Sequence, residues 1–506
     1  MLYAGFDCST QRLTVVVIDV GGVKRDVVFR DSVVFDSDLP GFATHHGVTV
    51  TTAAGVVHTD PRLWAEALAT MLGRLATGID TGCLRAISGS AQQHGSVYCG
   101  ATPDILTRPT SPIWMDSSTT EDCAAIERAL GGSASLARLT GSRAFPRFTG
   151  PQIRKFAREE PQAYAATIRI HLVSSYLASV LTGRHAPVDH ADGSGMNLMD
   201  IRTRTWAATA LAATAPDLES RLPPLVQSSA IVGTLSGQFQ ELFGLPPVKI
   251  VAWSGDNPCS LVGTGLVSEG QLSISLGTSD TIFGPMHEAR VSEDGTGHVF
   301  AAPTGEYMGI TVFRNGSLAR ERMRDRYGLD WRGFSDALAT TAAGNGGAMM
   351  LPWFEPEITP LVSTGNVVQQ GLDAASPARN VRALIEGQMM AMSRHSRWMG
   401  IRPGVIYATG GASANREILQ VVADVFDADV HRFESTDSAA LGAALRAWQA
   451  DTHAAWTDVV ADFCAPVPGS NVSPIQEHVT AYEALQRRYS ALERRALSGD
   501  TLPRGS

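Results

Sequence analysis

The chain has 506 residues, of which 44% are hydrophobic and 18% are charged, and its formal net charge is −9. This balance is typical of a soluble globular protein with two or more domains. The arginines are dispersed among acidic residues, which excludes a protein that binds nucleic acid through a basic stripe. No apolar run reaches the roughly 18 residues of a membrane span, so a membrane-spanning protein is not expected.

The six cysteines are spread along the chain, and none of them forms a C-x-x-C pair, so zinc and redox motifs built on such pairs are not expected. Met1 leads almost at once into a strand-like run, so we expect no signal peptide. These features predict a reduced, cytoplasmic protein, either a monomer or a homodimer. Residues 499–506 are treated as a tail outside the fold.

The first half of the chain alternates predicted strands and helices. Its clearest helix has apolar residues at helical spacing from Leu63 to Leu75, with Asp60 as the N-cap and Pro61 at the first helical position. The predicted strands cover residues 2–7, 13–20, 24–35 and 84–90, and the predicted helices cover residues 61–75, 151–159 and 169–181.

A second round of strands and helices begins near residue 249. The predicted strands cover residues 249–253, 271–276, 298–302, 307–313 and 405–409, and the predicted helices cover residues 382–399, 415–426, 438–450 and 474–497. Both halves begin with β-rich segments, so we predict two α/β domains, residues 1–248 and 249–498, related by an internal duplication. A cleft between them is the expected ligand site.

Two polar turns occupy equivalent places in the two halves. Asp7 leaves the first strand, where its carboxylate could hold Mg²⁺, and the hydroxyl of Thr10 could contact phosphate. Gly277 and Thr278 form the matching turn, which could offer backbone N–H groups to a phosphate. The alternative for each is an ordinary hairpin turn, although two such turns together favour a phosphate site.

A carboxylate and an amide, Asp256 and Asn257, follow an apolar run on a glycine turn. In phosphoryl transfer, such a carboxylate accepts the proton of the attacking hydroxyl, while positioning and charge stabilisation supply most of the catalysis. The alternative is that Asp256 caps the helix-like stretch that follows it.

Two further polar segments suit a ligand rich in hydroxyl groups. His94 lies in a polar segment after a predicted strand, and a structural histidine is the alternative. Arg147 lies in a loop rich in glycine and proline, from which it could bind ligand oxygens bidentately, although composition alone favours a solvated loop. Arg320, in a series of alternating arginines, is expected on a solvated helix surface.

A glycine pair, Gly410 and Gly411, lies between a predicted strand and a predicted helix, where the backbone could approach a nucleotide closely. The sequence has no G-x-x-x-x-G-K-[ST] loop, which excludes an ordinary P-loop kinase. No G-x-G-x-x-G follows the first strand either, which argues against a Rossmann dehydrogenase.

Taken together, these motifs resemble those of the FGGY family of carbohydrate kinases, which belong to the actin-like ATPase superfamily. Within that family the likeness is strongest to the members that phosphorylate D-xylulose, in particular the type found in eukaryotes. It extends from Gly5 to Gly442, over nearly the whole chain. The most specific segments are residues 92–98, 114–120, 192–197, 255–258, 275–280 and 408–413.

The resemblance implies two ribonuclease-H-like domains, with ATP, Mg²⁺ and a sugar in the cleft between them, and phosphorylation of the 5-hydroxyl of D-xylulose. It also implies residue roles. Asp256 would be the general base; Asn257, His94 and Arg147 would contact the ketose; Asp7, Thr10, Gly277 and Thr278 would flank the phosphates and Mg²⁺; Gly410, Gly411, Ala412 and Asn415 would line the adenosine site; and Trp331 would form a wall beside the adenine.

Two alternatives remain open at this stage. The same chemistry could act on another ketose or polyol, such as ribulose, glycerol, gluconate or a seven-carbon ketose, because a few hydrogen bonds decide sugar identity. The chain could instead be a non-catalytic, actin-like ATP-binding protein, although such a scaffold has no need of a base facing a hydroxyl pocket.

Overall fold

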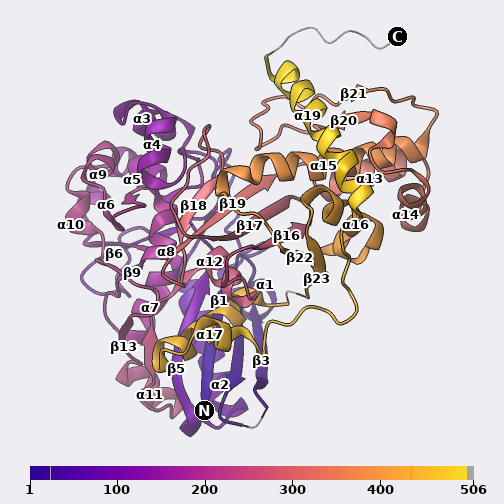
Figure 1. Cartoon of the computed structure of the whole chain (residues 1–506). Coiled ribbons are helices and arrows are strands. Elements are labelled where there is room, and N and C mark those ends of the chain that lie inside the picture. Colours follow the sequence, from indigo (N-terminus) through magenta and orange to yellow (C-terminus); the bar gives the residue numbers. More distant parts are fainter. Residues whose placement is uncertain (23, 435, 499–506) are drawn as a thin grey trace.

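The computed structural model describes residues 1–22, 24–434 and 436–498, so the expected tail at residues 499–506 lies outside the described residues. Two mixed β-sheets form the centres of two α/β halves, and helices cover the faces of each sheet (Figure 1). Over the described ranges, no helix combines the length and the apolar character needed to cross a bilayer.

The first sheet has the strand order β13-β14-β5-β1-β2-β3. Strands β1, β2 and β3 are antiparallel neighbours, whereas β1, β5 and β14 run parallel. The short strand β15 also pairs with β5 in parallel. The bounds are β1 Leu2–Cys8, β2 Arg12–Asp19, β3 Asp26–Val34, β5 Leu84–Ala91, β13 Ile231–Thr234, β14 Lys249–Val251 and β15 Ser254–Gly255.

One face of this sheet is covered by α2 (Pro61–Gly78) and α7 (Val173–Thr182), which share a hydrophobic cluster with β1 and β5. The apolar stripe of α2 faces the sheet as its spacing predicts, and the Asp60 side chain accepts a hydrogen bond from Arg62 N. Strand β1 is buried along almost its whole length, because helices cover it on both sides.

The second sheet has the order β18-β19-β17-β16-β22-β23. Its five strands β19-β17-β16-β22-β23 repeat the order and directions of β3-β2-β1-β5-β14, which confirms the internal duplication and the two ribonuclease-H-like domains expected from the sequence. The bounds are β16 Gln271–Leu276, β17 Asp280–Met286, β18 His298–Ala301, β19 Tyr307–Phe313, β22 Val405–Thr409 and β23 Asp429–Arg432.

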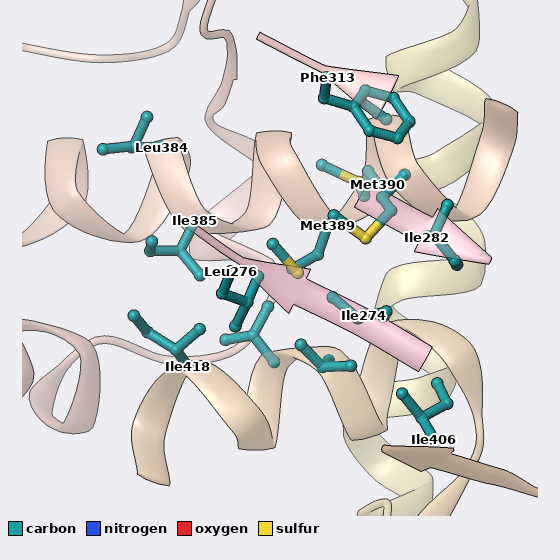
Figure 2. Packing of buried hydrophobic residues seen from close by; sticks show 14 of the residues in the cluster. Ile274, Leu276, Ile282, Phe313, Leu384, Ile385, Met389, Met390, Ile406 and Ile418 are labelled. Carbon is teal, nitrogen blue, oxygen red and sulfur yellow. The ribbon is translucent and has the colours of Figure 1, made fainter. Parts of the chain in front are cut away.

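The core of the second half lies between this sheet and the helices α15 (Pro377–Ser396) and α16 (Arg416–Phe426). Figure 2 shows Met389 of α15 close to Ile274 of β16, with Ile406 of β22 and Ile418 of α16 in the same cluster. The buried side chains of α15 recur along its whole length, so this helix is the main element packed on the sheet.

The remaining longer helices form a separate group at each end of the molecule (Figure 1). Beside the first sheet are α3 Thr120–Ala129, α4 Ser133–Thr140, α5 Thr149–Glu159, α6 Pro161–Ala166, α9 Ala208–Thr214 and α11 Gly237–Phe243; beside the second are α13 Ser317–Arg326, α14 Trp331–Thr340 and α19 Gln476–Ser498.

The helix expected over residues 169–181 begins later than predicted. Residues Arg169–Leu172 form strand β8, which pairs with β6 (Ser96–Cys99), and helix α7 begins only at Val173. Residues 169–172 form a strand because they pair with residues at least 70 positions earlier in the chain, and the local apolar periodicity does not indicate that pairing.

The two halves are connected more closely than a division at residue 249 implies. Strands β14 and β15, which the predicted boundary places in the second domain, pair with β5 of the first sheet. The helices α12 (Asp256–Gly263) and α17 (Ser438–Thr452) then cover the second face of that sheet, so a late segment of the chain returns beside β1 and β5 (Figure 1).

Glycines allow α12 and α17 to pack this closely. A Cβ atom on Gly263 would overlap Ser438 O, and one on Gly442 would overlap Cys259 O. A substitution at either position would therefore separate the two helices, which lie behind the strands that carry the candidate site.

Candidate active site

Three side chains of the candidate site follow the carboxyl ends of neighbouring parallel strands. Asp7 lies in β1, opposite Ser90 of β5. Asp256 follows β15, whose two residues pair with Ser90 and Ala91 of β5. Strand β15 lies on the edge of β5 opposite to the edge that pairs with β1. His94 lies three positions after the end of β5. Ligands of open α/β sheets bind at such strand ends, and this arrangement brings the three residues to one edge of the first sheet.

The carboxyl group of Asp256 is half-buried at the first position of α12, after the N-cap residue Gly255. Its Oδ1 accepts hydrogen bonds from Asn257 N at 2.7 Å and from Asn257 Nδ2 at 3.0 Å. Burial, and then the charge of Asp7, raise the pKa of Asp256 from 3.8 to about 7. A carboxyl with a pKa near neutrality is suited to accept a proton from a substrate hydroxyl.

The carboxyl group of Asp7 accepts a hydrogen bond of 2.8 Å from Ser90 Oγ. Burial raises its pKa to about 6, and the charge of Asp437 acts in the same direction. A divalent cation would relieve this concentration of negative charge. Among the described residues, no group of three or more His, Cys, Asp or Glu side chains could hold a metal ion by itself. The carboxylate of Asp7 is the kind of oxygen ligand that Mg²⁺ takes together with substrate phosphates.

His94 is held in a fixed orientation at the other side of the site. Its backbone is in the left-handed region with φ 73°, and its Nδ1 lies 2.9 Å from Gly195 O. Its ring packs against Phe148 at a centroid distance of 4.4 Å. Burial lowers the pKa of His94 to about 3, so the imidazole is neutral, carries its proton on Nδ1 and keeps Nε2 as an acceptor.

Arg147 is half-buried, in contrast to the solvated loop that composition favours. Its guanidinium lies 4.7 Å from the ring centre of Phe145 and 5.4 Å from that of Phe148, and its Nη2 lies 3.0 Å from His298 Nε2. Burial lowers the pKa of Arg147 to about 10, so it stays charged at neutral pH. The remaining donors of this guanidinium are available for oxygen atoms of a ligand.

All four residues predicted to contact the sugar line a single cavity of about 790 Å³. They are His94, Arg147, Asp256 and Asn257. The cavity lies between the two halves, because its walls also include residues of the second sheet and of the loop at residues 356–363. Its size and its mixture of aromatic and polar groups are those of a small-molecule site.

A second cavity, of about 820 Å³, contains most of the residues predicted to contact ATP. Among its lining residues are Gly277, Thr278, Trp331, Gly411, Ala412 and Asn415. The ring of Trp331 is 46% exposed, and the guanidinium of Arg324 lies 4.5 Å from its centre. Asn415 caps α16 through its Oδ1, so only its amide nitrogen remains for a ligand.

The turn between β16 and β17 lies between the two cavities. Gly277 and Thr278 line the second cavity, whereas Ser279 and Thr281, which follow directly, line the first. Gly410 lies behind this turn with φ 82°, and a Cβ atom there would lie 2.6 Å from Leu276 O. Glycine is therefore required at position 410 to keep the ends of β16 and β22 together.

A buried ion pair supports the same turn. Arg320 donates to both carboxylate oxygens of Asp280 at 2.8 and 2.9 Å and to Gly277 O at 3.2 Å. The expectation that Arg320 lies on a solvated helix surface is therefore wrong, because its side chain is almost completely buried against β17. A buried guanidinium requires a carboxylate partner, and only the tertiary structure brings Asp280 to it.

Thr10 and Asp7 do not line either cavity. Thr10 lies in the turn between β1 and β2 and accepts a hydrogen bond of 2.9 Å from Trp114 Nε1, and Trp114 itself lines the first cavity. The two predicted phosphate turns therefore lie at different positions relative to the cavities, and only the turn of the second half contributes directly to their walls.

Two residues of the site were missed as individual contacts. His298 begins β18 and is buried in the wall of the first cavity, beside Arg147. Gln93 was noted only as part of a polar segment, yet its Oε1 accepts a hydrogen bond of 2.9 Å from Asn257 Nδ2. Gln93 could have been found from its position next to His94, whereas the sequence around His298 reads as an ordinary strand.

Comparison with known proteins supports the family resemblance that the sequence motifs indicated. Residues 2–263 match the N-terminal domain, and residues 272–450 the C-terminal domain, of the FGGY family of carbohydrate kinases. The chain is 41% identical over 526 residues to the xylulose kinase of Mus musculus, covering 98% of this chain and 94% of the mouse protein. It is 41% identical over 487 residues to xylulose kinase 2 of Arabidopsis thaliana, covering 88% and 86% of the two chains.

The fold is also similar to that of solved structures. The crystal structure of a xyloylose kinase from Brucella ovis matches this chain with a TM-score of 0.85 and 25% identity, covering 99% of this chain and 100% of that one.

Proposed function

This chain belongs to the FGGY family of carbohydrate kinases, and from this premise we propose that it transfers the terminal phosphoryl group of ATP to D-xylulose, giving D-xylulose 5-phosphate and ADP. The observation that carries the proposal is the convergence of a carboxyl with a raised pKa, Asp256, and the side chains of His94 and Arg147 in one cavity. Xylulose kinases that are 41% identical over nearly the whole chain support D-xylulose as the substrate.

In this proposal Asp256 is the general base. Its Oδ1 is held by Asn257, which leaves Oδ2 for the hydroxyl at C5 of the ketose. Asp256 accepts the proton as the hydroxyl oxygen forms its bond to the terminal phosphorus of ATP, and the bond from that phosphorus to the bridging oxygen of ADP breaks. The base contributes chiefly by orienting the hydroxyl and removing its proton late in the transfer.

The rest of the sugar is held by residues that discriminate among hydroxyl patterns. Nε2 of neutral His94 accepts a hydrogen bond from a sugar hydroxyl, and the free donors of Arg147 bind hydroxyl or carbonyl oxygens. His94 is buried and Arg147 is half-buried, and a missing partner is costly for such groups, so a sugar of the wrong length or configuration is rejected.

The phosphates of ATP are assigned to the turn of Gly277 and Thr278, whose backbone N–H groups stabilise the charge of the transferring group. Mg²⁺ would be held by Asp7, directly or through water, together with phosphate oxygens, and when bound it would neutralise charge on those phosphates. The adenosine is assigned to the second cavity, with Trp331 beside the base.

We place this reaction in the cytoplasm, because all six cysteines are free and ATP is the phosphoryl donor. Closure of the two halves over the sugar would exclude water and limit wasteful hydrolysis of ATP.

The test is ADP release by the purified enzyme with a panel of D-xylulose, D-ribulose, glycerol, gluconate and a seven-carbon ketose, with ³¹P NMR of the product. We expect D-xylulose to give the highest kcat/KM and a product phosphorylated at C5. A higher kcat/KM for another member of the panel would assign the enzyme to that sugar, and ADP release that no sugar stimulates would refute the proposal.

A further inference from the structure

The segment Asp192–Asn197 is among those that most specifically resemble the FGGY family, yet the proposed mechanism assigns no role to Asp192. This residue belongs to the short helix α8 (His190–Gly193) and is only 1% exposed. It does not line the sugar cavity. Burial of a carboxyl group lowers the stability of the folded protein unless the group is hydrogen-bonded or protonated. We therefore looked at which groups hydrogen-bond to Asp192.

Asp192 is connected to the general base by three successive hydrogen bonds. Gln93 Nε2 donates to Asp192 Oδ1 at 3.3 Å, and Gln93 Oε1 accepts from Asn257 Nδ2 at 2.9 Å. Asn257 Nδ2 also donates to Asp256 Oδ1 at 3.0 Å. Two amide side chains therefore connect two carboxyl groups, one in α8 and one in α12.

The acceptor at Asp192 selects one direction for these bonds, and the Asp256 carboxyl selects the same direction from the other end. A glutamine amide has one face that donates and one that accepts, so an acceptor at Asp192 turns the Gln93 oxygen towards Asn257. That oxygen in turn fixes the Asn257 amide with its nitrogen towards Asp256. If Gln93 rotated, its NH₂ group would face the NH₂ group of Asn257, and an Asn257 that followed would present its oxygen to the Asp256 carboxylate.

The surroundings of Asp192 keep it an acceptor for Gln93 even when it carries a proton. Its Oδ2 lies 2.5 Å from Ser174 Oγ, and its backbone N donates to Asp189 Oδ1 at 2.8 Å. Burial, and then the charge of Asp189, raise the pKa of Asp192 to about 8. Ser174 Oγ donates to Oδ2, and Oδ1 remains free to accept from Gln93 in either protonation state.

We propose that Asp192 is a positioning residue for phosphoryl transfer: acting through Gln93 and Asn257, it fixes the orientation of the Asp256 carboxyl towards the sugar hydroxyl. The inference rests on the proposed role of Asp256 as the base. It predicts that the acceptor at position 192 matters and that its charge does not, so asparagine should replace this aspartate.

The kinetic test compares four single variants with the wild-type enzyme. Asp192→Asn keeps an acceptor for Gln93 and a donor for Ser174, and we expect its kcat to stay within about three-fold of wild type. Asp192→Ala and Asp192→Leu remove the acceptor, and we expect kcat to fall at least about 30-fold with KM for ATP unchanged. Ser174→Ala loosens Asp192 without removing it, so its loss should be smaller, and the double variant Ser174→Ala/Asp192→Ala should be no slower than Asp192→Ala alone.

A neighbouring pair of buried residues provides the matched control. Ser228 Oγ lies 2.5 Å from Asp189 Oδ2, which is the same kind of contact as that between Ser174 and Asp192. Among the described residues, neither Ser228 nor Asp189 forms a hydrogen bond with Gln93. Ser228→Ala should therefore lower the melting temperature about as much as Ser174→Ala and leave kcat unchanged. Equal kcat losses in the two serine variants would mean a merely structural role and would overturn the proposal.

A structural readout separates this proposal from the proposed function. In crystals of Asp192→Ala or Asp192→Leu without substrates, we expect Asn257 Nδ2 to lie beyond hydrogen-bond distance of Asp256 Oδ1. If that contact is intact in both variants, or kcat is unchanged in either one, the inference fails while the kinase assignment stands. If the wild-type enzyme phosphorylates no sugar, the assignment fails, and the displacement of Asn257 still decides whether Asp192 positions Asp256.

Discussion

Arg147 and His298 come from opposite sides of the cleft and meet through a hydrogen bond of 3.0 Å between Nη2 and Nε2. Arg147 precedes α5 in the first half, whereas His298 begins β18 of the second sheet. Burial, and then the charge of Arg147, hold the pKa of His298 well below its usual range, so its Nε2 is an acceptor at neutral pH. The second half of the molecule therefore orients a guanidinium of the first half that we propose binds the sugar.

Loss of this acceptor should weaken sugar binding. We expect His298→Ala to raise KM for D-xylulose about ten-fold, because one hydrogen bond to a charged group is worth about 1.5–3 kcal/mol, with KM for ATP unchanged. His298→Gln, which keeps an acceptor, should recover part of the loss. His287 is an exposed histidine of the same half, so His287→Ala is the control in steady-state kinetics. An unchanged KM for D-xylulose in His298→Ala would show that Arg147 needs no such support.

Removal of the base should abolish sugar phosphorylation while the fold survives. We expect Asp256→Ala and Asp256→Asn to lower kcat by about 100-fold to 10,000-fold, the range that general bases contribute, with the circular dichroism spectrum unchanged. Single-turnover formation of D-xylulose 5-phosphate is the measurement. Near-normal turnover in either variant would remove Asp256 from the mechanism.

The raised pKa of Asp256 predicts how activity depends on pH. Only the deprotonated carboxyl accepts a proton, and its pKa is about 7 in the protein without substrates. We therefore expect log kcat/KM for D-xylulose to rise by about one per pH unit below this pKa and to level off above it. A profile that is flat between about pH 5.5 and 8 would contradict the assignment.

The same shift predicts the stability of the asparagine variant. Between pH 3.8 and about 7 the folded protein holds a proton on Asp256 that the unfolded chain releases, so the contribution of this group to stability falls as pH rises. Asp256→Asn removes the buried charge, and it should melt at a higher temperature than wild type at about pH 8. The difference should shrink as the pH approaches about 4, which differential scanning calorimetry can follow.

The buried pair of Arg320 and Asp280 should support both stability and the phosphate turn. Arg320→Met leaves the Asp280 carboxyl buried without its partner, so we expect the free energy of unfolding to fall by about 3–5 kcal/mol and KM for ATP to rise. Arg322 lies on the same helix but is exposed, with its side chain paired to Glu355, and Arg322→Met is the control. Equal effects of the two substitutions in urea titrations would show that burial of Arg320 has no special role.

The aromatic wall of the second cavity should matter for ATP and not for the sugar. We expect Trp331→Ala to raise KM for ATP about five-fold to ten-fold through loss of a stacking partner, and Trp331→Phe to raise it less. KM for D-xylulose should stay the same in both variants. If instead KM for the sugar rises and that for ATP does not, the nucleotide binds elsewhere.

Local sequence pattern predicted several elements well. The strands at residues 271–276, 307–313 and 405–409 have the predicted bounds, and the helix after Asp60 begins where its cap and its proline place it. These segments carry strong local signals: continuous apolar runs bounded by glycine turns, or an N-cap followed by a regular apolar stripe. The residues at their ends, including Gly277 and Thr278 after the strand at residues 271–276, could therefore be named in advance.

Contacts between distant segments could not be predicted in this way. The sequence gives no sign that residues 249–255 pair with β5 or that α17 returns to the first sheet. For the same reason the burial of Arg320 and the contact of His298 with Arg147 were missed. Each depends on a partner at least 40 positions away, and the hydrophobic period of a segment does not specify which distant segment covers it.

The order of residues along the chain specifies which chemical groups this enzyme has, because motifs such as Gly255-Asp256-Asn257 couple residue type to a strand end or a glycine turn through local backbone geometry. How those groups work together depends on the packing of distant segments. That packing buried Asp7 and Asp256, which raised both pKa values, and it connected Asp192 to Asp256 through two amides. The burial of an ionisable group and its interaction with nearby charges depend on every segment that packs around it. These two causes of a pKa shift therefore arise only in the folded protein.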